Sequence, residues 1–252
     1  MTKTKTIGAA TTVTNVNTSQ YIPLTDASGD VTKITLGNLK ASLLAGMNLD
    51  AMNEGVFIMF HRNSDNYPVM VKPHKWASYQ SSGEIAEGVV VVEGGKILVV
   101  APTEASLYWS SAAVSGGGVT TTDRVLALND WAGKANTTAQ MTKSECNTVS
   151  YAPGFCGAYS RVNANGQGLI AGKWWLPSLG EMTMIYANMT KINYALSLIN
   201  GATQLAEISY WTSTEYSSTG AWLLTLNYGG ASNGGAKATY QGRVRAVSAF
   251  LM

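Results

Sequence analysis

The stretch Trp174–Phe250 organises this sequence. It opens with WWLPS at Trp174–Ser178, continues through YWTSTE at Tyr210–Glu215, and closes with RVRAVSAF at Arg243–Phe250. Between the last two blocks, residues 217–242 consist mostly of Ser, Thr, Gly, Asn, Ala and Tyr. Two segments whose residues are typical of a stable fold therefore flank a segment whose residues the fold constrains only weakly. This contrast is the main functional clue in the sequence.

The composition favours a β-rich and loop-rich protein of an extracellular or virion type. The chain has 252 residues, of which 46% are apolar and 13% are charged, with 26 glycines. This length suits one large domain, or one domain with a small appendage. An ordinary β domain with a weakly charged surface fits the same composition equally well.

Charge and hydropathy exclude two classes of partner. The net charge is +2 and basic residues form no cluster, so the sequence predicts no binding to nucleic acid. The longest apolar run, near position 90, has only the length of a strand, which excludes membrane insertion. The basic residues at the start precede no hydrophobic segment, so we expect no signal peptide. An externally acting protein would then leave its cell by another route, such as inside a virus particle.

Residues 1–50 are predicted to form an arm and a small attachment unit. Residues 1–20 are rich in Thr and nearly featureless, which is typical of an arm that a partner orders. Tyr21–Thr25 and Val31–Leu36 are β-prone and flank a loop containing Asp and Gly, which predicts a hairpin. A short helix at Leu39–Leu44 follows. The pattern resembles the N-terminal segments of phage tail-fibre and tail-tip proteins, although any small β-β-α cap fits as well.

Short strands are predicted from Asn53 onward. The clearest signal is a hairpin, Gly88–Val92 and Ile97–Val100 around Gly94-Gly95, whose continuous apolar residues predict burial on both faces. Thr137–Ser160 is predicted to be helical in part, with an interruption at Pro153-Gly154. The other predicted strands or apolar anchors are Val56–Phe60, Pro68–Val71, Leu107–Trp109, Ser209–Ser213, Ala221–Leu226 and Arg243–Phe250.

Two consecutive helices are predicted after the WWLPS block. Ser178 precedes Glu181 by three residues, which is the spacing of a capping box. The first helix is expected to end near Met189, with Leu179, Met182, Ile185 and Tyr186 facing inward. The second places Ile192, Leu196, Leu198 and Ile199 on one side and ends at Asn200-Gly201.

The blocks at 175–181, 210–215, 221–222 and 243–250, in this order, resemble the C-type lectin-like fold of the formylglycine-generating-enzyme type. The resemblance is strongest to the variable proteins of diversity-generating retroelements, and it covers about residues 53–252. It implies an α+β fold with short twisted antiparallel strands and about two helices. It also implies a ligand-display domain over 51–252, preceded by the attachment and oligomerisation segment 1–50.

In that family, adenine-directed mutagenesis rewrites codons for a binding surface near the C-terminus. Such codons do not become Trp, Met, Gln, Glu or Lys, so Trp222, Lys237 and Gln241 are expected to belong to the constant frame. Small residues and Tyr are typical of adaptable recognition surfaces, although the glycine pairs also fit simple turns between strands. The predicted ligand-binding set is Ser217, Thr219, Gly220, Leu223, Thr225, Tyr228, Gly230, Ser232, Asn233, Gly234, Gly235, Thr239, Tyr240 and Gly242.

Several side chains of the C-terminal stretch have competing interpretations. Leu223 and Thr225 alternate with Leu224 and Leu226, so one set is expected outside and the other inside. Arg243 and Arg245 are expected to pair with Glu215 or Glu181 rather than to contact ligand. Core packing is favoured over a sugar-stacking platform for Trp174, Trp175, Trp211 and Trp222.

The sequence favours no enzyme activity, no cofactor and no metal. Cys146 and Cys156 precede the WWLPS block, outside the region where the related enzymes carry their reactive cysteines, and are expected to be buried thiols rather than a disulfide. His61 and His74 lie far from both cysteines and carry no catalytic motif. The motifs of calcium-dependent sugar lectins are also missing, since Asn129-Asp130-Trp131 has the wrong order.

These observations lead to a phage tail-tip receptor-binding protein as the favoured hypothesis. Its expected partners are a bacterial surface protein or glycan, other phage tail proteins through residues 1–50, and two further copies in a homotrimer, and its expected location is the virion. The alternatives are a bacterial surface adhesin with the same display domain, and a structural tail component without diversification. An oxidase-type enzyme would require a reactive Cys146 or Cys156.

Overall fold

The computed structural model describes residues 21–25, 31–35 and 54–249. The chain divides into two units, 1–52 and 53–252. In unit 1, β1 (Tyr21–Thr25) pairs with β2 (Val31–Thr35) in an antiparallel hairpin, which confirms that prediction. The predicted arm at 1–20 and the predicted helix at Leu39–Leu44 lie outside the described residues.

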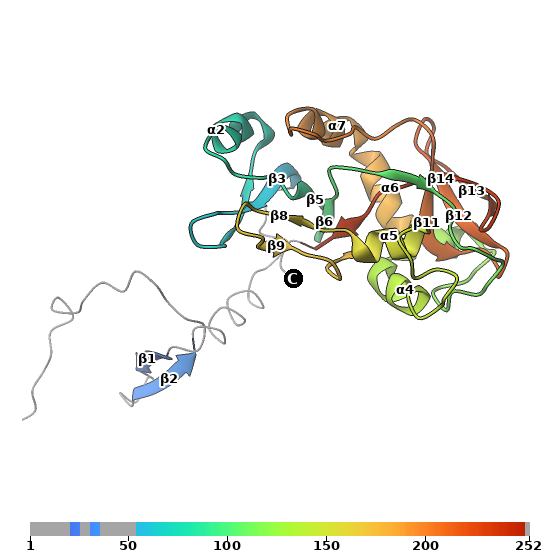
Figure 1. Cartoon of the computed structure of the whole chain (residues 1–252), viewed down its shortest axis with the longest axis horizontal. Helices are drawn as coiled ribbons and strands as arrows, with labels where there is room; N and C mark the ends of the chain where they lie inside the picture. The colour runs from blue at the N-terminus through green and yellow to red at the C-terminus, as the bar shows by residue number, and fades with distance from the viewer. Residues whose placement is uncertain (1–20, 26–30, 36–53, 250–252) are drawn as a thin grey trace, which may run out of the picture. The chain divides into compact units, whose positions relative to one another are not determined.

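Unit 2 has a mixed α+β architecture (Figure 1). Its larger sheet has six strands, and every neighbouring pair in it is antiparallel. The spatial order is β10 (Trp174–Trp175), β15 (Val247–Ser248), β6 (Lys96–Val100), β5 (Gly88–Glu93), β3 (Gly55–His61) and β4 (Pro68–Val71).

The β5–β6 hairpin forms the centre of this sheet, as predicted. Val89–Val92 are at most 2% exposed, so β5 is covered on both faces. Gly94 and Gly95 both have positive φ, 55° and 71°, and together form a two-residue turn between the strands. Positive φ at both central positions suits the right-handed twist of a hairpin and favours glycine there.

The second sheet has five strands and contains one parallel pair. β11 runs parallel to β14, and the other neighbours are antiparallel. The spatial order is β13 (Gly230–Ala236), β12 (Gly220–Thr225), β11 (Ser209–Glu215), β14 (Gly242–Val244) and β7 (Ala105–Leu107). A further two-stranded hairpin joins β8 (Arg161–Val162) to β9 (Gly168–Leu169).

The chain crosses between the two large sheets four times: from β6 to β7, from β7 through the β8–β9 hairpin to β10, from β10 to β11, and from β14 to β15. The predicted single strand at 243–250 is therefore two short strands in different sheets. Arg245 lies at this crossing with no exposed surface. Its guanidinium donates to the carbonyls of Ala101 and Thr203 at 2.9 Å, and to Glu104 Oε2 at 2.6 Å. The β6–β7 and β14–β15 connections are also joined directly, because Ala101 N donates to Ala246 O at 2.9 Å.

The described part of unit 2 contains six α-helices and a short 3-10 helix. These are η3 (Pro73–Lys75), α2 (Trp76–Ser81), α3 (Arg124–Leu128), α4 (Gly133–Gln140), α5 (Ala152–Ala158), α6 (Leu179–Ala187) and α7 (Met189–Ser197). The helical parts predicted between Thr137 and Ser160 are α4 and α5, and Pro153 lies in the first turn of α5. Proline suits that position because the amides of a first turn have no intrahelical acceptor.

The capping box at the start of α6 is confirmed. Ser178 Oγ accepts from Glu181 N at 3.4 Å, while Glu181 Oε2 accepts from Ser178 N at 2.8 Å. Glu181 Oε2 also accepts from Trp175 Nε1 at 3.1 Å. The predicted inward residues of α6 and α7 are buried, except for Tyr186 and Leu198, which are half-buried.

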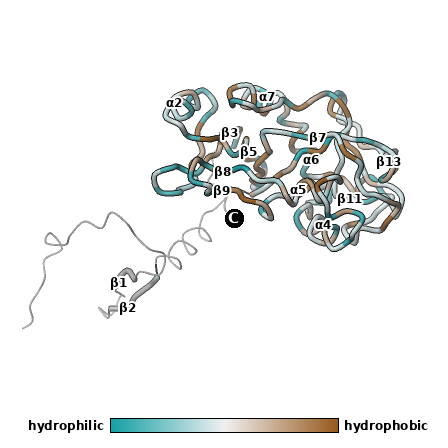
Figure 2. Tube along the Cα trace, viewed as in Figure 1, coloured by the Kyte–Doolittle hydropathy of each residue, from teal (hydrophilic) through white to brown (hydrophobic). Residues whose placement is uncertain are grey.

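The hydrophobic core joins both large sheets to α6 and α7. In Figure 2 the hydrophobic stretches gather in the interior of unit 2. Phe60 and Val91 come from the first sheet, Tyr210 and Leu224 from the second, and Ile185 from α6. The predicted core tryptophans, Trp174, Trp175, Trp211 and Trp222, are each at most 6% exposed. Cys146 and Cys156 are free and buried, as predicted.

The pH dependence of stability is expected to depend on Glu181. Burial raises the pKa of this carboxyl from 4.5 to about 7, and the negative charge of Asp130 adds to the effect. Between these values the folded protein binds more protons at this site than the unfolded chain, so the free energy of unfolding falls as pH rises from 4.5 to 7, by about 3 kcal/mol. Glu181→Gln keeps an acceptor for Ser178 N and does not titrate.

Urea titrations at pH 5, 6, 7 and 8 are expected to show this fall in wild type and a flatter profile in Glu181→Gln. Glu145→Gln is the matched control, since hydrogen bonds to its exposed carboxylate lower the pKa of Glu145 and keep its titration below this window. Equal slopes in wild type and Glu181→Gln would contradict the assignment.

Candidate recognition surface

Three loops contact one another at one end of the second sheet: residues 110–122, 216–219 and 237–241. We call these residues the loop surface. Glu215 N donates to Val119 O at 2.8 Å, which joins the end of β11 to the first loop. Lys237 N donates to Thr219 O at 3.0 Å, and Trp109 N donates to Lys237 O at 2.9 Å. Segments from three parts of the chain thus form one surface.

A buried ion pair fastens the loop surface. Lys237 Nζ lies 2.5 Å from Glu215 Oε2, and neither side chain is exposed. The ammonium also donates to the carbonyls of Val114 at 2.7 Å and Ser217 at 2.9 Å, and it lies 4.3 Å from the centre of the Trp109 ring. Burial lowers the pKa of Lys237, but the hydrogen bond to Glu215 opposes this shift. With three acceptors for its three protons, the ammonium connects all three loops.

The carboxylate of Glu215 is held by backbone amides as well. Gly116 N donates to Oε2 at 2.8 Å, and Gly118 N donates to Oε1 at 3.2 Å. A Cβ atom on Gly116 would lie 2.7–2.8 Å from Gln140, Glu215 and Trp109, which is closer than side chains pack. Glycine is therefore required where the 110–122 loop passes over the carboxylate.

The fourteen predicted ligand-binding residues differ widely in exposure. Exposed are Thr219, Tyr228, Asn233, Thr239 and Tyr240. Half-buried are Ser217, Thr225, Gly230 and Ser232. Buried are Gly220, Leu223, Gly235 and Gly242, and Gly234 lies within β13.

Most of the exposed members lie at two ends of the β12–β13 hairpin, and Asn233 lies in the middle of β13. Gly220 pairs with Ala236 near the loop surface, whereas Thr225 pairs with Gly230 at the other end. Tyr228 is in the turn that follows Thr225, so it is separated by the length of the hairpin from Thr219. The structure thus brings only part of the predicted set together.

Leu223 corrects one expectation. Leu224 and Leu226 face the core as one set, but Leu223, which alternates with them, is also buried, at 3% exposure. Leu223 pairs with Trp211 in the sheet, and a Cβ atom on Gly235 would meet both side chains. The Trp211 ring therefore packs on this face, where the alternation alone predicts solvent.

The predicted partners of the two arginines were also wrong. Arg245 and Arg243 both pair with Glu104, at 2.6 and 3.6 Å, and not with Glu215 or Glu181. Glu104 Oε2 also accepts from the Tyr210 hydroxyl at 2.7 Å. Glu215 pairs with Lys237 instead. Sequence reasoning missed Glu104 because it lies in a crossing segment without any motif.

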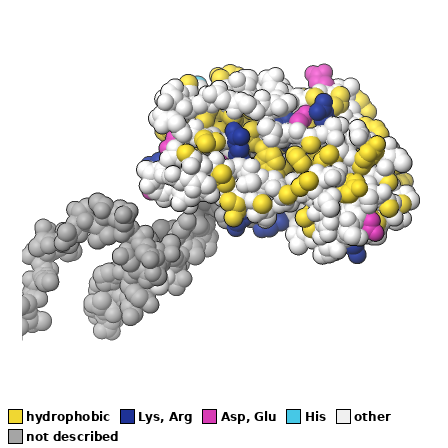
Figure 3. All heavy atoms as spheres, viewed as in Figure 1, with side chains coloured by type: hydrophobic (Ala, Val, Ile, Leu, Met, Phe, Trp, Pro, Cys, Tyr) yellow, Lys and Arg dark blue, Asp and Glu magenta, His cyan; other side chains and the backbone are white. Residues whose placement is uncertain are grey.

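The 110–122 loop was missed as well, although the sequence contains a signal for it. Its residues, SSAAVSGGGVTTT, repeat the small, hydroxyl-rich and uncharged composition of 217–242. In Figure 3 the visible face of unit 2 carries charged side chains only as isolated spots. Comparing segment compositions would have identified 110–122 as a second low-charge segment of the same type.

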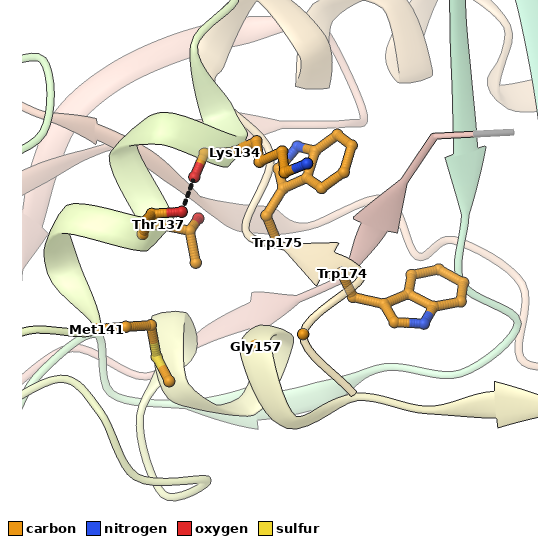
Figure 4. Close-up of a pocket in the computed structure, with 8 residues that line it drawn as sticks. Lys134, Thr137, Met141, Gly157, Trp174 and Trp175 are labelled. Atoms are coloured by element: carbon orange, nitrogen blue, oxygen red, sulfur yellow. Dashed lines mark hydrogen bonds between the residues drawn. The ribbon is translucent and has the colours of Figure 1, made fainter. Parts of the chain in front are cut away.

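Three pockets adjoin one another, and α4 lines two of them. The first, about 200 Å³, is lined by Lys134, Thr137, Gly157, Trp174 and Trp175 among others (Figure 4). The next two, about 640 and 350 Å³, share Trp131, and the larger also shares Lys134 with the first. None of the described lining residues belongs to the loop surface. The polar atoms of Thr137 and Trp175 are bonded within the protein, so they offer little to a ligand.

Among residues 21–25, 31–35 and 54–249, no group of three or more His, Cys, Asp or Glu is arranged to hold a metal ion. Within the same described ranges, no helix has the length and hydrophobicity that a membrane span requires. Burial raises the pKa of the Cys146 thiol to about 11, so this thiol is protonated at neutral pH.

Comparisons with known proteins provide no family. No family model matches the chain, and no curated protein matches it. A solved structure of a fimbrial protein from Bacteroides ovatus ATCC 8483 is similar, with 18% identity and a TM-score of 0.45. The match covers 60% of this chain and 35% of that protein. At this TM-score the likeness carries no argument about function.

Lys237→Met is expected to lower the free energy of unfolding by about 3–5 kcal/mol, because it leaves the buried Glu215 carboxylate without its partner. Urea denaturation followed by tryptophan fluorescence measures this change. The exposed Lys191→Met is the matched control, expected within about 0.5 kcal/mol of wild type. The double variant Glu215→Gln/Lys237→Met is expected to recover part of the loss. Equal stability of the two single variants would contradict the assigned role.

Leu223→Ala is expected to destabilise unit 2 by about 2–5 kcal/mol, as truncation of a buried leucine does. Thr219→Ala, at an exposed position of the predicted set, is expected to change stability by less than about 0.5 kcal/mol. Thermal and urea unfolding of both variants test this division. If Leu223→Ala leaves the free energy of unfolding unchanged, the assignment of Leu223 as a buried residue is wrong.

Proposed function

We propose that this chain is a phage tail-tip receptor-binding protein. In this proposal unit 2 is a C-type lectin-like display domain of the diversity-generating-retroelement type, without enzyme activity or cofactor. Its ligand is a protein or glycan of a bacterial surface. Residues 1–50 attach the chain to other tail proteins and support a homotrimer, in which weak contacts multiply through avidity.

The way in which the loops are held carries the proposal. Lys237 contacts the 216–219 loop through the backbone carbonyls of Ser217 and Thr219. A carbonyl is present whatever side chain a codon specifies, so these two contacts survive a change of residue. Ser217 also contributes its side chain, since Ser217 Oγ accepts from Thr219 N and Gly220 N at 3.2 Å, so Thr219 is the freer of the two positions. A surface that is rewritten must have this property, because most substitutions in a packed core are destabilising.

The distribution of residue types also supports it. Trp222 and Lys237 belong to the types that adenine-directed mutagenesis does not produce, and they are 4% and 0% exposed. Thr239 and Tyr240, which such mutagenesis can produce, are exposed beside Lys237. Gln241 is exposed, and burial does not explain a constant residue there.

The DNA around the encoding gene tests this function. We expect a near-copy of the segment for residues 217–242 next to a reverse transcriptase gene, with the two copies differing only where the near-copy has adenine. Such differences should concentrate at the exposed and half-buried members of the predicted set. A neighbourhood without this near-copy would contradict diversification and favour a fixed structural tail component.

A further inference from the structure

We propose that the loop surface, including the 110–122 loop, binds an uncharged polysaccharide. The inference rests on the proposed function and specifies its ligand. It adds a second segment, outside residues 217–242, to the part of the protein that contacts the ligand.

The surface is electrically neutral, and this points to a neutral ligand. Lys237 is the only charged residue within 110–122 and 216–242, and its ammonium is buried against Glu215. Protein interfaces use complementary charges for orientation and for exclusion of wrong partners, and arginine is enriched in them. An anionic glycan would require accessible cations. A neutral polysaccharide requires neither complementary charges nor accessible cations, because its hydroxyl groups exchange hydrogen bonds with Ser and Thr hydroxyls and with backbone groups.

One tyrosine ring is held in a fixed orientation beside these hydroxyls. Tyr240 is 38% exposed and meets the ring of Trp211 edge-to-face, at 5.6 Å and 86°. Tyr216 packs instead on Trp222, which belongs to the core with Leu224, so it does not extend the Tyr240 platform. An aromatic face is electron-rich and attracts the C–H groups of a sugar ring. Because packing already orients the Tyr240 ring, binding loses little side-chain entropy.

The 110–122 loop lies in position to contact the same ligand. Val114 O binds the ammonium that also binds Ser217 O, and Thr121 N donates to Glu215 O at 3.0 Å. Ala113 and Thr120 are exposed. A polymer that lies across Tyr240 and Thr219 therefore has this loop within reach of its neighbouring units.

The test is an array of polysaccharides probed with the full chain. The array carries neutral polymers, namely dextran, mannan, galactan and β-glucan, beside anionic polygalacturonate and hyaluronate. We expect binding to at least one neutral polymer, with an affinity that changes less than twofold between 50 and 500 mM NaCl. Binding to anionic polymers alone, or to no neutral polymer, overturns the proposal.

Three variants locate the binding site on the polymer that is bound. Ala113→Arg places a long cation on the 110–122 loop, and Tyr240→Ala removes a ring, so each is expected to weaken binding at least tenfold. Ala77→Arg adds the same cation at an exposed alanine of α2, at the opposite end of unit 2 in Figure 1, and is expected to bind as wild type does. Circular dichroism and the Tm check that each variant is folded.

The outcomes separate this inference from the proposed function. If Tyr240→Ala weakens binding and Ala113→Arg does not, the contribution of the 110–122 loop is overturned while the display surface stands. If a bacterial surface protein binds and Tyr240→Ala abolishes that binding, the neutral polysaccharide is overturned but receptor binding remains. If a neutral polymer binds but the gene has no near-copy, diversification fails and the carbohydrate site stands.

Discussion

The guanidinium of Arg245 joins the connection between β14 and β15 to the connection between β6 and β7, where the chain passes between the two large sheets of unit 2. A buried charge is unfavourable unless it is paired and hydrogen-bonded. Both terminal nitrogens of Arg245 meet this requirement, with the Glu104 carboxylate and two carbonyl groups from other segments, while the buried Nε has no partner. Because the chain passes from β14 to β15 at this residue, these contacts hold the connection between the two sheets in place.

The Lys237–Glu215 pair repeats this arrangement at the far end of β11. Its acceptors are again backbone carbonyls and a buried carboxylate, and its donors connect three loops that have little hydrophobic material of their own. Loops of small residues lose much conformational entropy on ordering and gain little from burial. Hydrogen bonds to charged groups in a dry interior are among the stronger polar interactions. One fixed ammonium can therefore order a surface whose exposed side chains contribute little to the fold.

Local signals predicted the α+β class and several individual elements, but the expectation of about two helices was wrong, since the described part of unit 2 has six α-helices. Long-range polar contacts were not predictable from the sequence. The Gly94-Gly95 turn and the Ser178–Glu181 capping box depend on neighbouring residues, so their spacing was sufficient. The pairing of Arg245 with Glu104 spans 141 positions, and many carboxylates fit a charge equally well before the fold is known. The prediction for Leu223 was wrong for a related reason. Alternation along a strand shows which residues share a face but not what covers that face. The six-stranded sheet and the four crossings between the sheets likewise required the structure.

Within the proposed function, the structure narrows the set of positions that can vary freely. Gly235 lies under Trp211, and a Cβ atom there would come within 2.3 Å of the indole. A Cβ atom on Gly242, in β14, would lie 3.0 Å from the same ring. Gly220 differs, since the nearest atom to its Cβ would be 3.4 Å away, an ordinary contact distance. Because Trp211 packs against Gly235 and Gly242, a larger residue at either site would displace the ring that orients Tyr240. The Trp211 indole can therefore orient the variable surface only while the residues packed against it, Gly235 and Gly242, stay small.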